Sequence, residues 1–291
     1  MNPLNIDPTI DYKGVSVPTF FYGTAWKEAR TEAATRMAIE AGFRGIDTAN
    51  QRRHYDEAAV GSAIQKVFAS GALKREDLFL QTKFTYPASQ DHRIPYDAHA
   101  EPADQVKQSL ESSLSHLQTD YLDAFLLHGP SVSHGWHDTD WRVWRTMEAL
   151  QHEGTVRLIG VSNVDRDQLA LLLDKSEIKP AVIQNRCFAS TLWDSEVRTL
   201  CRSQGIIYQG FSLLTGNAME LNSLTVRTIA RRLECTLARI IFRFALQSGM
   251  IPLTGTMSEP HMLEDLSAYD INLNAEEMDA IKHIASPFRR H

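Results

Sequence analysis

Short apolar runs alternate along the chain with stretches in which apolar side chains recur every three or four residues. The short runs predict buried strands, and the recurring spacing predicts helices with one apolar face. Eight strands are expected, at residues 19–22, 43–47, 78–82, 121–127, 156–161, 181–184, 206–211 and 250–253. These runs are apolar throughout rather than alternating, which is typical of parallel strands covered on both faces.

Helical spacing follows most of these strands. Helices are expected up to residue 41, at 57–70, around 106–117, around 143–150, at 168–174, and at 224–247 in two pieces. Two more should begin near Ser258 and Asn274, whereas the polar stretches 86–102 and 129–138 should be long loops.

This alternation predicts a single α/β domain, a (β/α)8 TIM barrel over residues 1–291 with a short C-terminal tail from residue 286. The rival is a doubly wound open sheet. That fold would favour a G-x-G-x-x-G turn after the first strand, and the motif is absent. In a barrel the chemistry lies at the C-terminal ends of the strands, so the candidate residues are sought there.

Composition narrows the class of protein. The 291 residues carry a net charge of −6 with acids and bases mixed, so neither a nucleic acid nor a membrane surface is an expected partner. No apolar run approaches the ~20 residues that span a bilayer, and residues 1–14 lack the apolar core of a secretory signal. Cys187, Cys201 and Cys235 show no metal spacing. Reduced thiols in a cytoplasmic protein without a metal are therefore expected.

Four titratable side chains stand at or just beyond three consecutive strand ends. Asp47 ends the second strand and Tyr55 follows in its loop, while Lys83 and His128 follow the third and fourth strands. Each has an ordinary structural role open to it: a loop cap, a rim aromatic, a lysine reaching solvent, or a core histidine. Because the strand ends of a barrel face one space, the four together favour a shared site over four separate roles.

The chemistry of these groups suits carbonyl reduction. A tyrosine titrates near pH ~10, and a cation such as Lys83 beside it would lower its pKa. Asp47 would keep Lys83 charged, and His128 would donate a hydrogen bond to a substrate oxygen. Tyr55 would then protonate that oxygen while a hydride arrives at the carbon. Lys83 should act electrostatically, so Lys83→Met is expected to abolish turnover without destabilising the fold.

Several motifs in order along the chain resemble those of the aldo-keto reductases. They are the stretches GFRGIDTA at 42–49, VGSAI at 60–64, FLQTK at 79–83, DYLD at 120–123 leading to His128, IGVSN at 159–163, and Gln184. The resemblance spans nearly the whole chain and implies a catalytic tetrad of Asp47, Tyr55, Lys83 and His128. It also implies NADP(H) as cofactor, with NAD(H) as a second candidate, and a small-molecule carbonyl substrate.

The resemblance further implies a set of residues around the cofactor. Ser162, Asn163 and Gln184 would hold the nicotinamide carboxamide, Phe211 would stack on the ring, and residues 212–217, including Ser212, Leu214 and Gly216, would form the pyrophosphate loop. The remaining expected contacts are Gly23, Thr24, Ala25, Asp47, Thr254, Gly255, Thr256, His261, Glu264 and Asp265. Trp26, Trp136 and Trp141 are the candidate aromatics of the substrate pocket.

The sequence departs from the family pattern at four places. The spacing from Asp47 to the tyrosine is unusual, so His54 is the reserve candidate for the proton donor. Gly129 replaces a common tryptophan, and the short tail from residue 286 predicts an open pocket. Residues 251–256 replace the basic segment that binds the cofactor 2′-phosphate in the family. Gly255 stands there where a lysine is common, which predicts weak selectivity between NADPH and NADH.

Three other positions of this phosphate-binding segment affect how tightly NADPH is expected to bind. His261 stands where an arginine is common and Asp265 where an asparagine is common, whereas Glu264 matches the family. With no fixed cation expected there, NADPH binding should tighten as the pH falls and His261 gains a proton.

Two other functions stay open. A redox-silent regulatory subunit could keep the barrel and the cofactor without turnover. A cofactor-free lyase or isomerase could use Lys83 as a Schiff base. The sequence predicts neither the substrate nor the oligomeric state.

Overall fold

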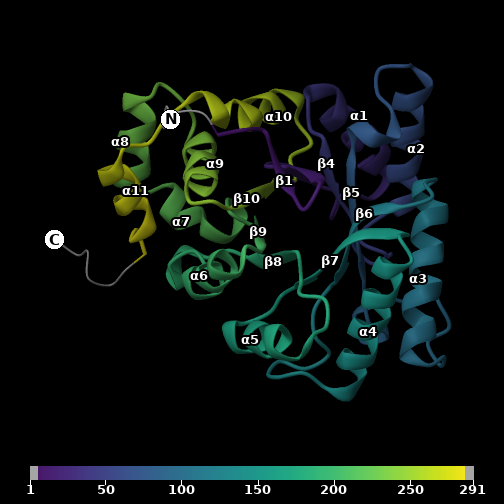
Figure 1. The fold of residues 1–291 in the computed structure, drawn as a ribbon. Helices are drawn as coiled ribbons and strands as arrows, with labels where there is room; N and C mark the ends of the chain where they lie inside the picture. The colour runs from purple at the N-terminus through teal and green to yellow at the C-terminus, as the bar shows by residue number, and fades with distance from the viewer. Residues whose placement is uncertain (1–5, 286–291) are drawn as a thin grey trace.

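The computed structural model describes residues 6–285. Eight parallel strands close into a barrel in the order β10-β3-β4-β5-β6-β7-β8-β9. Figure 1 shows the whole fold as a ribbon. The strands are β3 (Phe21–Gly23), β4 (Gly45–Asp47), β5 (Phe79–Phe84), β6 (Leu122–Leu127), β7 (Val156–Ser162), β8 (Val182–Arg186), β9 (Ile207–Phe211) and β10 (Ile251–Thr254). The predicted (β/α)8 barrel is confirmed, with strand boundaries within two residues of those expected from the apolar runs.

Helices pack around the barrel. They are α1 (Thr31–Ala41), α2 (Glu57–Ala69), α3 (Pro102–Leu117), α4 (Asp138–His152), α5 (Arg166–Lys175), α6 (Ser195–Gln204), α7 (Ala218–Leu221), α8 (Leu224–Arg232), α9 (Leu237–Gln247), α10 (Glu259–Leu266) and α11 (Ala275–Lys282). In Figure 1, α1 to α4 cover one side of the barrel and α5 to α9 the other. The last two helices begin directly after Ser258 and Asn274, as predicted.

The sequence did not predict the N-terminal hairpin or the helices α6 and α7. The antiparallel hairpin β1 (Thr9–Tyr12) and β2 (Val15–Pro18) precedes the barrel. Its turn, Lys13-Gly14, has positive φ at both residues, of 53° and 84°, and lacks the Asn-Gly or Asp-Gly signal of such turns. Helix α6 was also missed, because only Val197 and Cys201 of its ten residues are buried, too few for a clear apolar period.

The polarity of the barrel interior changes along β5. Successive inward positions are two residues apart. On β5 these are Phe79, Gln81 and Lys83, and only Phe79 belongs to the apolar cluster at the N-terminal end of the barrel. Val17 of the hairpin joins that cluster. The N-terminal end is therefore filled with hydrocarbon, and the polar groups gather at the C-terminal end.

Three further expectations bear on the chain as a whole. Cys187, Cys201 and Cys235 are unpaired. No helix in residues 6–285 combines the length and the apolarity needed to cross a bilayer. The short tail expected from residue 286 lies outside the described residues.

Candidate active site

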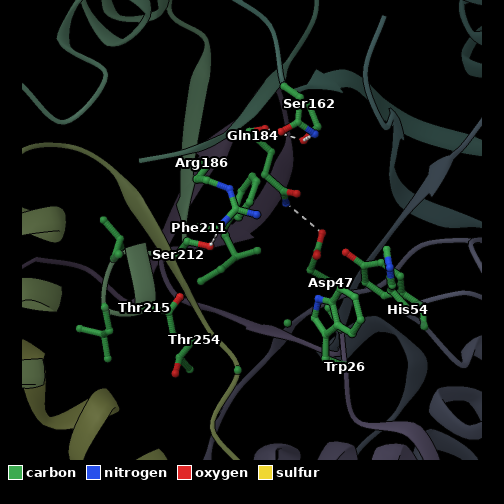
Figure 2. Close-up of a pocket in the computed structure, with 18 of the residues that line it drawn as sticks. Trp26, Asp47, His54, Ser162, Gln184, Arg186, Phe211, Ser212, Thr215 and Thr254 are labelled. Atoms are coloured by element: carbon green, nitrogen blue, oxygen red, sulfur yellow. Dashed lines mark hydrogen bonds between the residues drawn. The ribbon is translucent and has the colours of Figure 1, made fainter. Parts of the chain in front are cut away.

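A cavity of about 1470 Å³ lies at the C-terminal ends of the barrel strands. It gathers side chains from both halves of the chain, from Trp26 and His54 on one side to Phe211 and Thr215 on the other (Figure 2). The predicted residues that line it are Gly23, Ala25, Trp26, Asp47, Tyr55, His128, Ser162, Asn163, Gln184, Phe211, Ser212, Leu214, Thr254, Gly255, Thr256, His261, Glu264 and Asp265. The structure thus brings most of the candidate residues together around one space.

Lys83 and Asp47 form a buried ion pair beneath this cavity. Lys83 Nζ lies 2.7 Å from each carboxylate oxygen of Asp47 and 2.8 Å from the carbonyl oxygen of Thr48. These acceptors match the three N–H groups of an ammonium. Burial lowers the pKa of Lys83, and the contacts with Asp47 oppose that shift. Lys83 is 1% exposed and does not line the cavity itself.

A network of buried amides holds the Asp47 carboxylate from below. The side-chain nitrogens of Gln81 and Gln184 lie 2.7 Å and 2.9 Å from Asp47 Oδ1. Both nitrogens also donate to the side-chain oxygen of Gln209. Gln81 and Gln209 were not expected as part of the site, and the only signal was a glutamine inside each apolar strand. The network fixes the position of Asp47 with respect to three strands.

The Tyr55 ring lies close to two other members of the predicted tetrad. Lys83 Nζ is 5.5 Å from the ring centroid, and the His128 ring is 6.0 Å away in an edge-on arrangement. Burial and then the negative charge of Asp47 raise the pKa of Tyr55, while Arg186 opposes the shift. The expectation that Lys83 lowers this pKa is therefore wrong for the protein alone, because burial and the Asp47 carboxylate set the direction of the shift.

His128 is a buried, neutral ring at the edge of the same space. Its Nδ1 lies 2.7 Å from the hydroxyl of Thr85. Burial, followed by the positive charges of Lys83 and His54, lowers the pKa of His128 to about 3. At neutral pH the ring carries one proton, and a Thr85 hydroxyl that donates to Nδ1 leaves that proton on Nε2.

His54, the reserve candidate for the proton donor, lines the cavity with its ring protonated on the other nitrogen from that of His128. Its Nδ1 lies 2.8 Å from Gln51 Oε1, which can only accept, so the ring is protonated at Nδ1. Burial and Arg53 lower its pKa, and the ring stacks on Trp26 with centroids 3.8 Å apart. A neutral His54 therefore has no proton on Nε2 to donate.

Polar side chains at the ends of β7 and β8 form one wall of the cavity. Asn163 donates its NH₂ group to His128 O at 2.8 Å and to Ser162 Oγ at 3.1 Å, and Gln184 gives its NH₂ group to Asp47 and Gln209. Within residues 6–285 no donor bonds to the side-chain carbonyl oxygen of either amide, so both can accept from a ligand. Asn163 adopts φ +56°, a left-handed conformation that is uncommon away from glycine and is found at functional sites.

Arg186, which was not predicted, lies over the ring of Phe211. Its guanidinium carbon is 5.2 Å from the ring centroid, and Nη1 donates to Ser212 Oγ at 3.1 Å (Figure 2). The side chain is exposed in the cavity. A flat ligand that stacks on this face of Phe211 would have to displace the guanidinium.

Two predicted cofactor positions, Thr24 and Gly216, do not line the cavity. Thr24 is fully buried, and its hydroxyl donates to the Asp47 carbonyl. Gly216 faces Phe188 instead of the cavity, since a Cβ there would lie 3.2 Å from that ring. Both are close to the cavity without lining it.

Trp136 and Trp141 are not pocket aromatics as expected. The two rings stack on each other with centroids 5.1 Å apart, and Trp136 Nε1 donates to the carbonyl of Gln168. Neither lines the cavity. Gly129 does line it, and a Cβ there would only reach ordinary contact with Asn163 at 3.5 Å.

The corner at the ends of β3 and β10 contains a cation that the sequence did not indicate. Lys27 Nζ donates to the carbonyl of Gly255, and Lys27 is 6% exposed. A Cβ added to Gly255 would lie 3.1 Å from this nitrogen. The expectation that no fixed cation stands beside Gly255 is therefore wrong. Lys27 was missed because it lies 228 residues away along the chain.

Comparison with known proteins defines the class of this protein. A profile of the aldo/keto reductase family matches residues 19–286. A glyoxal reductase from Bacillus subtilis is 32% identical over 96% of this chain and 93% of its own length. A prostaglandin-E(2) 9-reductase from Oryctolagus cuniculus is 30% identical over 95% of this chain and 90% of its own length.

Solved structures agree with these sequence matches. An aldo/keto reductase from Brucella melitensis superposes with a TM-score of 0.81 at 27% identity, covering 96% of this chain and 98% of the other. An aldo-keto reductase from Bombyx mori in complex with NADP superposes with a TM-score of 0.80 at 26% identity, covering 95% and 92%. The chain belongs to the aldo/keto reductase family. It is an oxidoreductase of a family that uses nicotinamide cofactors.

Proposed function

We propose that this protein reduces an aldehyde or ketone to an alcohol, with NADPH and, more weakly, NADH as reductant, and with Tyr55 as the proton donor. The observation that carries the proposal is the placement of Tyr55 and His128 around one cavity, above the buried pair of Lys83 and Asp47. When bound, the cofactor supplies a hydride to the carbonyl carbon. The protein must then position the carbonyl and deliver a proton to its oxygen.

The donor set at the cavity wall fits a nicotinamide. The carboxamide of that ring has one acceptor and two donors, and the free carbonyl oxygens of Asn163 and Gln184 match its donors. Phe211 offers an apolar face once Arg186 has moved. These three residues would hold the reactive ring at the centre of the strand ends.

Tyr55 is better suited than His54 to donate the proton. Its raised pKa keeps the phenol protonated at every ordinary pH. An alkoxide is a much stronger base than a phenolate, so a phenol can still protonate it. His54 presents an unprotonated Nε2 to the cavity when its Nδ1 is bonded to Gln51.

His128 and Lys83 would assist from either side of Tyr55. A neutral His128 with its proton on Nε2 would donate a hydrogen bond to the carbonyl oxygen and position it. As negative charge develops on the phenol oxygen, the Lys83 ammonium 5.5 Å from the ring would stabilise it.

The substrate is proposed only as a small-molecule carbonyl compound. The relatives named as a glyoxal reductase and a prostaglandin-E(2) 9-reductase support a carbonyl substrate without agreeing on one molecule. Trp26, which is 67% exposed at the cavity, is the aromatic side chain best placed to contact it.

The two alternatives have less support. A Schiff base requires a neutral, accessible lysine, whereas Lys83 is 1% exposed and uses its N–H groups on Asp47 and Thr48. A redox-silent subunit would have no need for the amide network that positions Asp47.

Replacement of Tyr55 tests the proposal. Tyr55→Phe should lower kcat for an activated aldehyde about 10²–10⁴-fold, the usual contribution of general acid catalysis. NADPH binding, measured by quenching of protein fluorescence, should stay nearly unchanged. His54→Ala is the matched control from the same loop and should retain most of kcat. Full activity in Tyr55→Phe together with loss in His54→Ala would transfer the role to His54.

A further inference from the structure

The corner between β3 and β10 holds a buried ammonium that is paired only with a neutral group. Lys27 donates to the carbonyl oxygen of Gly255, and within residues 6–285 it forms no ion pair. The charge that acts on it most is that of Arg30, another cation. Burial and Arg30 lower the pKa of Lys27 to about 8. An anion beside Lys27 would offset both effects, so this corner favours an anionic ligand.

The lack of a side chain at Gly255 leaves room for the Lys27 ammonium. A Cβ on Gly255 would lie 3.1 Å from Lys27 Nζ, tighter than ordinary contact. The ammonium thus occupies the space where a side chain at position 255 would begin, and both residues line the cavity. Lys27, in the loop after β3, therefore places a cation where a lysine at position 255, after β10, would otherwise supply one.

The position of Lys27 along the cavity indicates which part of the cofactor it meets. Asn163, Gln184 and Phe211 would hold the nicotinamide at the ends of β7 to β9. From there the cavity extends to Leu237 of α9 and to His261 of α10. Placed along this arm of the cavity, the adenosine half of the dinucleotide would lie toward α9 and α10, on the side of β10 where Lys27 meets Gly255.

We propose that Lys27 binds the adenosine 2′-phosphate of NADPH and is the residue that makes this protein prefer NADPH over NADH. The inference rests on the proposed function. Hydrogen bonds between an ammonium and a phosphate are among the strong ones in proteins, and NADH has only a hydroxyl at the same position. The preference is expected to reach about tenfold to a hundredfold.

Binding constants for NADPH and NADH, measured by isothermal titration calorimetry, test this inference. Lys27→Met keeps the length of the buried side chain and removes the charge. It should weaken NADPH binding about tenfold or more and change NADH binding by less than about twofold. Lys107→Met is the matched control, because Lys107 is exposed on α3, and it should leave both constants unchanged. Gly255→Lys in the Lys27→Met background should restore the preference.

Each other outcome overturns the inference. If Lys27→Met weakened the binding of NADPH and NADH equally, Lys27 would lie at the pyrophosphate, which both cofactors contain. If Lys27→Met left the ratio of the NADPH and NADH binding constants unchanged, another group would bind the 2′-phosphate. If the unaltered protein bound neither cofactor, the proposed function itself would fail, and that result is distinct from a failure of Lys27 alone. Lys27→Gln, which keeps a donor for Gly255, replaces Lys27→Met if that variant does not fold.

Discussion

At the scale of single residues, burial changes the chemistry that the sequence suggests. A lysine next to a tyrosine predicts a lowered phenol pKa, but in the fold the Lys83 ammonium faces Asp47 and the Tyr55 pKa is raised. The four residue identities could be predicted because each follows a strand end. The protonation of Tyr55, Lys83 and His128 could not, since their pKa values depend first on burial and then on charges that the fold brings close to them.

The Lys83–Asp47 pair leads to a prediction about stability. Removal of one partner of a buried ion pair leaves an uncompensated charge and costs about 3–5 kcal/mol. Lys83→Met should therefore lower both turnover and the free energy of unfolding, in contrast to the expectation from sequence that the fold is unaffected. Urea denaturation would measure the loss. The double variant Asp47→Asn/Lys83→Met should recover much of the stability but no activity. A stable Lys83→Met protein would mean that water reaches Asp47.

At the scale of elements, apolar runs are sufficient to predict the eight barrel strands, and apolar periodicity is sufficient for most helices. It fails where an element buries little, as in α6, and where a turn lacks its usual residues, as at Lys13-Gly14. Close packing between strands is also hidden in the sequence. Gly160 and Gly210 both lie in barrel strands, yet a Cβ would meet the Val182 carbonyl oxygen at 2.2 Å in one case and nothing nearer than 3.5 Å in the other.

This difference predicts unequal effects of the same substitution. Gly160→Ala should destabilise the protein by about 1–3 kcal/mol, because β7 and β8 must move apart to admit the methyl group. Gly210→Ala is the matched control on β9 and should be nearly neutral. Thermal melts followed by circular dichroism would compare them. Equal melting temperatures would show that the barrel relaxes around residue 160 at no cost.

At the scale of the whole molecule, the cavity is lined by segments that span most of the described chain, from Gly23 to Asp265. The sequence motifs predict its nicotinamide end, where each residue follows its own strand. They do not predict the corner at Gly255, because its cation comes from Lys27 in the loop after the first barrel strand. A closed barrel allows a residue that follows β3 to supply the cation beside β10, since these are the first and last barrel strands along the chain and they pair directly.

The pH dependence of NADPH binding follows from the groups at this corner. Lys27, with a pKa lowered to about 8 by burial and Arg30, is charged below pH 8 and loses its charge above it. Asp265 lines the same cavity, and burial raises its pKa to about 7, so it gains a negative charge as the pH rises. Tyr22, beneath Lys27, has a raised pKa and stays neutral, while Glu264 and His261 complete the corner. Both titrations weaken phosphate binding as the pH rises.

We therefore expect the NADPH dissociation constant to increase about tenfold between pH 7 and pH 9.5, while that of NADH changes little. The range begins at pH 7 because a phosphate monoester, with a second pKa of about 6, is already nearly dianionic there. Lys27→Met should remove the transition near pH 8, and Asp265→Asn should remove only the part nearest pH 7. Titrations of both cofactors at half-unit pH intervals would resolve the two. NADPH binding that is constant across this range would show that neither group faces the 2′-phosphate.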